Sequence, residues 1–305
     1  MTAEAKEILV AFGIDAGYAP HLAAALASIV ANAPGARFRF MVIHDGVPEE
    51  EQWRIETAAP TQTFDWREVV DSRLLGLEGN HHISRATFYR FAIPVFAAPE
   101  VERAIYLDSD LIVLGDLREL IKVDLGDTML GAVFDPGADV EAFAQRMRNE
   151  VTPKPLAYFN AGVLLLDLAK IRASGAFEAA VRLALERADE LVYGDQDVLN
   201  YVLWDQWTRL DPMWNAQRRM LLQEGRACYA STEEMQIGRR PKIIHFTEEV
   251  KPWSKDGYHP LIWTYYRYLR RTPYWKRVNE KAGNSTIKHV RRLVRTSVNL
   301  SRLKA

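Results

Sequence analysis

Residues 104–114 read Ala-Ile-Tyr-Leu-Asp-Ser-Asp-Leu-Ile-Val-Leu, so Asp108 and Asp110 interrupt an otherwise continuous apolar run. An apolar run of this length is typical of a buried strand. Two like charges close together in such a setting are costly unless something neutralises them, and a divalent cation would do so. Because side chains alternate along an extended chain, both carboxylates would point to the same side. The stretch therefore predicts a buried strand that ends at a metal site.

The sequence before this stretch predicts strands that alternate with helices. Strands are expected over 8–12, 38–43 and 61–65, with helices over about 20–31 and 49–57 between them. This order is typical of an α/β domain with a parallel sheet. The first loop lacks the glycine-rich fingerprint of dinucleotide-binding proteins, which argues against an ordinary dehydrogenase.

The sequence after and around the stretch continues the α/β pattern without an internal repeat or a low-complexity linker up to residue 266. The further expected elements are strands over 128–134, 160–166 and 242–246, and helices over 84–97, over 177–187 and from 194 onward. This organisation favours one domain over residues 1–262, followed by a tail over residues 263–305.

The composition is that of an ordinary globular protein. The 305 residues are 48% hydrophobic and 26% charged, and no apolar stretch approaches the roughly 20 residues that span a bilayer. The single cysteine, Cys228, excludes an internal disulfide and favours a reducing compartment. Residues 1–7 lack the apolar core of a signal peptide. A cytoplasmic protein is expected.

The net charge of −1 conceals an acidic body and a basic tail. Residues 267–305 hold 12 Lys and Arg against the single acid Glu280, which leaves a charge of −12 on residues 1–266. The tail is rich in Trp and Tyr up to residue 275, and beyond Gly283 its apolar residues recur at helical spacing between basic ones. This pattern predicts attachment to an anionic membrane surface. A solvated helix on the acidic body is the alternative, and no nucleic-acid-binding motif accompanies the charge.

His245 is the third candidate metal ligand, because it also follows a short apolar segment, Ile243-Ile244. Two carboxylates and an imidazole suit Mn²⁺ or Mg²⁺ better than Ca²⁺. The alternatives are that the aspartates serve as turn or cap residues and that the histidine is a core residue with its hydrogen bonds satisfied.

Haloacid-dehalogenase-type phosphatases also carry Asp-x-Asp after an apolar strand. They usually carry it on the first strand, with Thr or Val where this chain has Ile112, and both departures count against them.

Four short motifs occur in an order that resembles a known family. They are Tyr106-Leu107-Asp108-Ser109-Asp110, Phe159-Asn160-Ala161-Gly162-Val163, Gly194-Asp195-Gln196-Asp197, and His245 followed by Lys251-Pro252-Trp253. Together they are similar to glycosyltransferase family 8, which includes bacterial lipopolysaccharide galactosyl- and glucosyltransferases and glycogenin. The resemblance extends from about Ile8 to Trp253.

The resemblance implies a GT-A fold, which is a Rossmann-like nucleotide-sugar-binding α/β domain with a mixed central sheet. It implies a retaining transfer of a hexose from a UDP-sugar, UDP-glucose or UDP-galactose, to a glycan or lipid-linked acceptor at the inner face of the cell membrane. Asp108, Asp110 and His245 match the metal ligands, and the ion would stabilise charge on the leaving diphosphate.

The remaining matched positions surround the donor. The resemblance implies that Asp15 and Tyr18 hold the uracil, that Arg90, Ser109 and Lys251 contact the donor, and that Asp135, Asn160, Asp195 and Gln196 surround the sugar. Each has a simpler alternative, such as a turn at Asp15 or a helix cap at Asp195. Asp195 and Asp135 are the available nucleophiles for a double displacement, while the Gln196 amide oxygen would suit an oxocarbenium-like ion. Front-face attack assisted by the leaving phosphate is the favoured mechanism.

Two positions depart from the family pattern. Glu248 stands where the family commonly has a glycine beside the phosphates, and Gly17 stands where an amide side chain is frequent. Because an acid beside a diphosphate is unfavourable, the alternative of a protein that binds UDP-sugars without turnover stays open.

Overall fold

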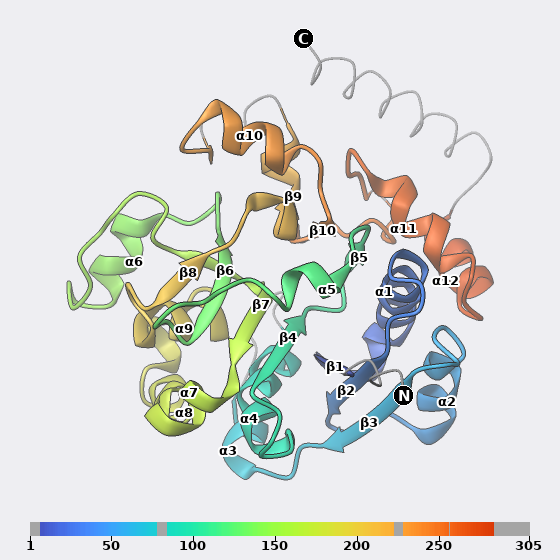
Figure 1. Cartoon of the computed structure of the whole chain (residues 1–305), viewed down its shortest axis with the longest axis horizontal. Helices are drawn as coiled ribbons and strands as arrows, with labels where there is room; N and C mark the ends of the chain where they lie inside the picture. Colours follow the sequence, from blue (N-terminus) through green and yellow to red (C-terminus); the bar gives the residue numbers. More distant parts are fainter. Residues whose placement is uncertain (1–6, 78–83, 223–227, 256, 284–305) are drawn as a thin grey trace, which may run out of the picture.

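The computed structural model describes residues 7–77, 84–222, 228–255 and 257–283, and Figure 1 shows a central sheet with helices on both faces. Seven strands form this sheet in the order β3-β2-β1-β4-β7-β6-β8. Their bounds are β1 Ile8–Ile14, β2 Phe38–His44, β3 Thr63–Glu68, β4 Arg103–Leu107, β6 Leu130–Phe134, β7 Phe159–Asp167 and β8 Trp207–Arg209.

The sheet is mixed, as the family resemblance implied. β1, β2, β3 and β4 run parallel to one another, which confirms the parallel pairing expected from the N-terminal order. β7 runs antiparallel to both β4 and β6, so the sheet changes direction beside the Asp-x-Asp segment. Polar residues that follow β4 therefore face those at the start of β7.

The apolar stretch 104–114 is divided between two sheets. Its first half is β4, and its second half is β5 (Leu111–Val113), which pairs with β10 (Ile243–His245) and through it with β9 (Ala216–Gln217). β5 and β10 are antiparallel, with His245 opposite Leu111, and Phe246 N donates to Asp110 O at 3.0 Å. This small sheet brings His245 beside the aspartates.

Two apolar cores occupy the two faces of the central sheet, because alternate side chains of each strand point to opposite sides. In β1, Val10 and Phe12 belong to the core that includes helix α1, while Leu9 and Ala11 belong to the core on the opposite face. All four are buried. Strands that are buried on both faces explain the nearly continuous apolar runs in the sequence.

Of the five helices expected within the described residues, four are confirmed, and the structure adds further helices where none was expected. Their bounds are α1 Ala19–Asn32, α2 Glu49–Glu56, α3 Ser72–Leu75, α4 Ile93–Phe96, α5 Leu117–Leu120, α6 Val140–Arg146, α7 Leu168–Ser174, α8 Ala176–Glu186, α9 Asp195–Val202, α10 Thr232–Gly238, α11 Ile262–Leu269 and α12 Trp275–Lys281. The single helix expected over 84–97 is instead a 3₁₀ helix, Arg85–Ala92, followed by α4. Pro94 lies in the first turn of α4 and cannot donate a backbone hydrogen bond to the preceding turn.

The aromatic part of the expected tail is folded onto the body. Tyr265, Tyr266, Tyr268 and Tyr274 are buried in the core beside α1, and Asn32 Nδ2 donates to Tyr268 Oη at 2.8 Å. The interpretation of these rings as membrane-interface residues is therefore wrong. Their regular helical spacing on α11 reflects packing against α1, which Figure 1 shows side by side with it. Trp263 on α11 is exposed, with 40% of its surface accessible to solvent.

The basic amphipathic helix expected beyond Gly283 lies outside the described residues. Within the described ranges, none of the helices has the length and apolar character needed to cross a membrane.

Candidate active site

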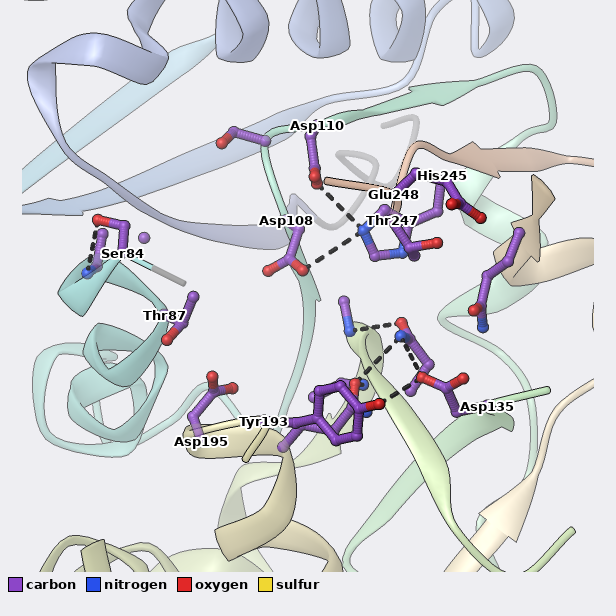
Figure 2. Close-up of a pocket in the computed structure, with 18 of the residues that line it drawn as sticks. Ser84, Thr87, Asp108, Asp110, Asp135, Tyr193, Asp195, His245, Thr247 and Glu248 are labelled. Atoms are coloured by element: carbon purple, nitrogen blue, oxygen red, sulfur yellow. Dashed lines mark hydrogen bonds and ion pairs between the residues drawn. The ribbon is translucent and has the colours of Figure 1, made fainter. Parts of the chain in front are cut away.

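A cleft of about 860 Å³ lies at the ends of β1, β4, β6 and β7, and Figure 2 shows some of the side chains that line it. Its lining includes all of the predicted site residues, which are Asp15, Tyr18, Arg90, Asp108, Ser109, Asp110, Asp135, Asn160, Asp195, Gln196, His245 and Lys251. The structure thus brings together side chains that lie up to 236 positions apart in the sequence.

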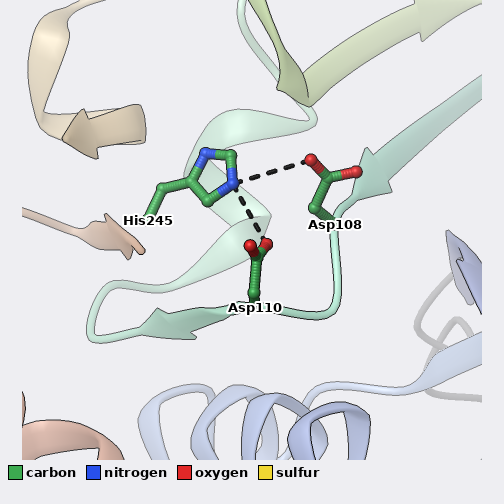
Figure 3. Close-up of side chains that lie close together, drawn as sticks. All are labelled: Asp108, Asp110 and His245. Atoms are coloured by element: carbon green, nitrogen blue, oxygen red, sulfur yellow. Dashed lines mark hydrogen bonds and ion pairs between the residues drawn. The ribbon is translucent and has the colours of Figure 1, made fainter. Parts of the chain in front are cut away.

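Asp108, Asp110 and His245 form a cluster that could hold a metal ion, which we call the metal cluster (Figure 3). His245 Nε2 lies 3.1 Å from Asp110 Oδ1 and 3.6 Å from Asp108 Oδ2, and one ligand atom from each residue lies within 4.8 Å of the others. His245 and Asp110 are buried, while Asp108 is half-buried. Two carboxylate oxygens and an imidazole nitrogen at this spacing fit a divalent cation with open positions for a ligand.

Gly162 on β7 makes room for this cluster. A Cβ atom at this position would lie 2.1 Å from His245 Cε1 and 2.6 Å from Asp108 Oδ2. Both distances are far below van der Waals contact, so a larger residue would displace the metal ligands. The glycine of the Phe-Asn-Ala-Gly-Val motif is thus required by the close approach of two ligand side chains.

Lys251 provides a cation at the same place. Its Nζ lies 2.7 Å from Asp110 Oδ2 and 2.7 Å from the carbonyl oxygen of Phe246. Burial acts to raise the pKa of Asp110, but the charges of Lys251 and His245 outweigh it and hold that pKa well below its ordinary value. Asp110 is therefore ionised and able to bind a cation across the whole physiological range.

Arg90 is buried and lies between the carboxylates of Asp108 and Asp195. Its Nη2 donates to Asp108 Oδ1 at 3.0 Å, and its Nε lies 3.0 Å from Asp195 Oδ2. The second contact is an ion pair without hydrogen-bond geometry, because Nε donates to Thr87 O at 2.8 Å. The guanidinium also stacks 4.1 Å from the ring centre of Tyr106. Arg90 is 1% exposed, which excludes the alternative of a surface arginine.

Asp135, Asn160 and Gln196 form a hydrogen-bonded network across the cleft from the metal cluster (Figure 2). Asn160 Nδ2 donates to Asp135 Oδ2 at 3.0 Å, and Gln196 Nε2 donates to the same oxygen at 3.1 Å. Gln196 Oε1 accepts from Ala161 N at 3.0 Å. Asp195 lies behind this network, where burial raises its pKa against the opposing charge of Arg90. We name the side chains of Asp135, Asn160 and Gln196 the sugar-side network, after the position that the family resemblance implies for them.

Comparison with known proteins decides the family. The model of glycosyl transferase family 8 matches residues 9–257. This chain belongs to glycosyltransferase family 8.

Relatives and solved structures agree with this assignment. General stress protein A of Bacillus subtilis (strain 168) is 31% identical over 283 residues, covering 88% of this chain and 95% of that protein. Lipopolysaccharide 1,3-galactosyltransferase of Salmonella typhimurium is 26% identical over 265 residues, covering 85% and 76%. A crystal structure of the galactosyltransferase LgtC in complex with donor and acceptor sugar analogues matches with a TM-score of 0.77 at 23% identity, covering 89% of this chain and 100% of that one. The chain has the GT-A fold, and the phosphatase alternative is left without support.

Asp15 organises the turn after β1, which also lines the cleft of this family 8 protein. Its Oδ1 accepts from Gly17 N at 2.8 Å and Tyr18 N at 3.2 Å, and its Oδ2 accepts from Ser84 Oγ at 2.7 Å. The turn interpretation of Asp15 is therefore correct locally, while its carboxylate still lines the cleft. Tyr18 lies edge-on to Trp253, with ring centres 6.3 Å apart.

Glu248, at the position where family 8 commonly has glycine, has a partner. Its Oε2 lies 3.3 Å from Arg218 Nη1. This ion pair compensates the charge of the acid, so the departure from the family pattern does not leave an uncompensated carboxylate beside the cleft.

Asp197 and Asn215 are buried residues of the site region that the sequence reading did not assign to a role. Asp197 Oδ2 accepts from Val192 N at 2.7 Å and Tyr193 N at 2.9 Å, and thereby holds the turn that presents Asp195. Within Gly-Asp-Gln-Asp the sequence gives no sign of which aspartate supports the other. Asn215 lies between the metal cluster and the sugar-side network, in a segment without any recognisable motif.

Proposed function

We propose that this protein is a metal-dependent retaining hexosyltransferase that moves a hexose from a UDP-sugar to a glycan acceptor, in lipopolysaccharide or another cell-surface glycan. UDP-glucose and UDP-galactose are the proposed donors. The observation that carries the proposal is one cleft that holds both the candidate metal cluster with Lys251 and the sugar-side network. The names of relatives, among them lipopolysaccharide 1,3-galactosyltransferase and lipopolysaccharide 1,2-glucosyltransferase, support the acceptor class.

Asp108, Asp110 and His245 would hold Mn²⁺ or Mg²⁺ in this role. When bound, the ion supplies electrostatic stabilisation of the charge that develops on the leaving diphosphate. Lys251 exchanges its contact with Asp110 for the diphosphate and adds a second positive charge there. Ser109, buried between the two aspartates, lines the same end of the cleft. Asp15 and Tyr18 are proposed to hold the uracil at the far end.

The environment of the two candidate nucleophiles favours front-face attack. Asp195 is 3% exposed and paired with Arg90, so its carboxylate is already neutralised. Asp135 is more accessible, but its Oδ2 accepts two amide hydrogen bonds and its Oδ1 accepts from Gly137 N. Both carboxylates are thus engaged, and they are better placed to stabilise a positively charged sugar than to form a bond with it.

A peripheral position on the inner face of the cell membrane is the second part of the proposal. Exposed basic residues gather on α11 and α12 and in the turn between them, and they are Arg267, Arg270, Arg271, Lys276, Arg277 and Lys281. The sequence adds a further six basic residues after Gly283. Such a charge would attract an anionic leaflet, where lipid-linked acceptors lie.

The first test is turnover of UDP-sugars by the purified protein with and without Mn²⁺. Replacing Asp110→Asn removes one ligand charge at nearly constant shape, so we expect hydrolysis or transfer to fall by at least about 100-fold. The circular dichroism spectrum should stay unchanged. The matched control is Asp205→Asn, an exposed aspartate paired with Lys154, and it should retain full turnover.

Undiminished turnover in a folded Asp110→Asn protein would contradict the metal role. Binding of UDP with neither hydrolysis nor transfer to any acceptor would instead support a binding protein without turnover.

A further inference from the structure

Asn215 connects the candidate metal cluster with the sugar-side network. It is the last residue of the 3₁₀ helix Pro212–Asn215, and its side chain is fully buried. Its Oδ1 lies 3.0 Å from His245 Nδ1, and its Nδ2 lies 2.8 Å from Asn160 Oδ1. One amide group therefore contacts a metal ligand on one side and the sugar-side network on the other.

The orientation of this amide follows from a backbone hydrogen bond. Gly162 N donates to Asn160 Oδ1 at 3.1 Å, and a backbone N–H has no other option than to donate. The Asn160 atom at this point must be its oxygen. The Asn215 atom that faces the same oxygen must then be a donor, which identifies it as Nδ2.

The position of the proton on His245 follows in turn. Because Nδ2 of Asn215 faces Asn160, the acceptor Oδ1 faces His245, and Nδ1 of the imidazole must carry a proton to donate. Nε2 is then the nitrogen directed at Asp110 and Asp108. Without an ion it donates to Asp110 Oδ1, because an ionised carboxylate can only accept, and a bound cation would take the place of this proton. A metal-binding imidazole needs a lone pair on the coordinating nitrogen, and the hydrogen bond of the other nitrogen sets this tautomer.

The same reasoning extends into the sugar-side network. Gln196 Oε1 accepts from Ala161 N, so the Gln196 amide is also oriented by a backbone donor, and its Nε2 faces Asp135. Asn160 Nδ2 donates to both Asp135 Oδ2 and Gln196 Oε1. Two consecutive backbone N–H groups of β7 thus fix three side-chain amides and one imidazole in a single arrangement.

We propose that Asn215 is a positioning residue of the metal site: its amide keeps the His245 proton on Nδ1, directs Nε2 at the two carboxylates, and links this imidazole to Asn160. The inference rests on the metal-dependent transfer proposed above. It adds a residue that touches neither the ion nor the sugar and acts through residues that do.

The first experiment locates the proton directly. In ¹⁵N-labelled protein without added metal, in mildly alkaline buffer, a long-range ¹H–¹⁵N correlation spectrum distinguishes protonated from unprotonated ring nitrogens. His245 is assigned by the loss of its signals in His245→Ala. We expect a protonated Nδ1 in the wild type, and in Asn215→Leu an unprotonated Nδ1 with the proton kept on Nε2 opposite Asp110. An unprotonated Nδ1 in the wild type would overturn the proposal.

The second experiment measures Mn²⁺ affinity by calorimetry, with and without UDP. Asn215→Leu removes the acceptor, and loss of such a partner typically weakens metal affinity about 10- to 100-fold. Asn215→Asp keeps an oxygen for Nδ1 and loses the donor to Asn160, so its Mn²⁺ affinity should stay within about threefold of the wild type. Equal losses in the two variants, or none in Asn215→Leu, would overturn the proposal.

The matched control is Asn32→Leu. Asn32 is a partly buried amide that donates to Val113 O at 2.9 Å and to Tyr268 Oη, away from the cleft. This variant should lower the melting temperature and leave Mn²⁺ affinity unchanged, which separates positioning from a general loss of stability. If Asn215→Leu fails to fold, the protonation of His245 Nδ1 in the wild type and in Asn215→Asp still tests the proposal. A wild type that binds no Mn²⁺ would contradict the proposed function, while the spectrum of the metal-free protein would still test Asn215.

Discussion

Gly162 shows how much the candidate site depends on one missing side chain. It follows Ala161 on β7, whose backbone N–H orients Gln196, while its own N–H orients Asn160. Its Cα faces the His245 ring, where a Cβ atom would overlap Cε1. The residue therefore serves the metal cluster by leaving space and the sugar-side network by donating a hydrogen bond.

We expect Gly162→Ala to weaken the metal site. The added methyl group forces His245 or Asp108 to move. Such overpacking typically lowers the free energy of unfolding by about 1–3 kcal/mol. Mn²⁺ affinity, measured by calorimetry, should fall together with stability towards urea. An unchanged affinity would show that the ligands accommodate the methyl group.

Val163→Ala is the control for this variant. Val163 is the next residue of β7 and is fully buried, so its truncation should cost a similar 1–3 kcal/mol, roughly what large-to-small core changes cost. Its side chain points to the opposite face of the sheet from Gly162. Mn²⁺ affinity should therefore stay at the wild-type value.

Among single residues, the candidate metal ligands were easier to predict from the sequence than the residues that position them. Asp108 and Asp110 stand out because charge inside an apolar run needs an explanation, and His245 stands out after a short strand. Asn215 has no such contrast with its neighbours. Its role depends on a hydrogen-bond partner 30 positions away, and no local pattern records that contact.

At the scale of elements, His21 lies where three segments meet. It belongs to α1, it stacks on Trp253 with ring centres 3.6 Å apart, and its Nδ1 shares a hydrogen bond of 2.7 Å with Tyr265 Oη on α11. Tyr266 Oη also donates to Pro252 O at 3.0 Å. The packing of α11 on α1 thus holds the loop that carries Lys251.

Burial lowers the pKa of His21 to about 3, against the attraction of Asp110. The folded protein therefore keeps this imidazole neutral where the unfolded chain already binds a proton. Stability from this group is present above the ordinary pKa of 6.5 and is lost as the pH falls from 6.5 towards 3. Between about pH 7.5 and about pH 5.5 the loss amounts to about 1.4 kcal/mol.

His21→Phe should remove this part of the pH dependence, because phenylalanine keeps the stacking and has no proton to bind. The measurement is urea unfolding at the two pH values. The lost hydrogen bond with Tyr265 lowers stability equally at both. His259, whose pKa burial also lowers to about 3, gives the matched variant His259→Phe with a similar effect. A His21→Phe protein with the wild-type pH dependence would contradict a neutral buried imidazole.

Element types were predictable wherever apolar periodicity was strong, and the segment 84–97 shows where that signal fails. Its apolar spacing is helical, yet Pro94 divides it, and the buried Arg90 donates to Ala161 O and Asp108 in the site as well as to Thr87 O of its own 3₁₀ helix. The antiparallel direction of β7 was equally invisible in its residues, because a strand buried on both faces reads the same in either direction.

At the scale of the whole molecule, the chain joins an acidic body to a basic surface. The exposed cations on and between α11 and α12 belong to helices whose other side chains pack in the core of the body. The predicted division at 262 and the membrane contact both remain predictions that truncation can test.

We expect deletion of residues 262–305 to abolish cooperative folding. It removes Tyr265, Tyr266, Tyr268 and Tyr274, and burying such side chains contributes about 1.5–3 kcal/mol each, which together rivals the 5–15 kcal/mol, roughly, of a typical domain. Thermal unfolding followed by circular dichroism is the measurement. A folded, active product would show that the body is complete without these helices.

Deletion of residues 284–305 should leave folding and UDP-sugar turnover unchanged and weaken binding to anionic vesicles. The segment holds half of the basic residues after position 266, and each contributes on the order of 1 kcal/mol near an anionic surface. Cosedimentation should therefore fall at least about tenfold, and neutral vesicles provide the control. Equal cosedimentation of both proteins would refute membrane attachment by this segment.

The pairing of β5 with β10 has a consequence for how the protein is made. Asp110 and His245 are 135 positions apart, so a growing chain carries the first carboxylates long before the imidazole leaves the ribosome. Contacts between such distant segments form late, because a long loop must close before they can contribute. Until β10 is synthesised and paired, the chain has two thirds of a cation site and no means of completing it. Competence to bind metal thus reports that nearly the whole body has folded.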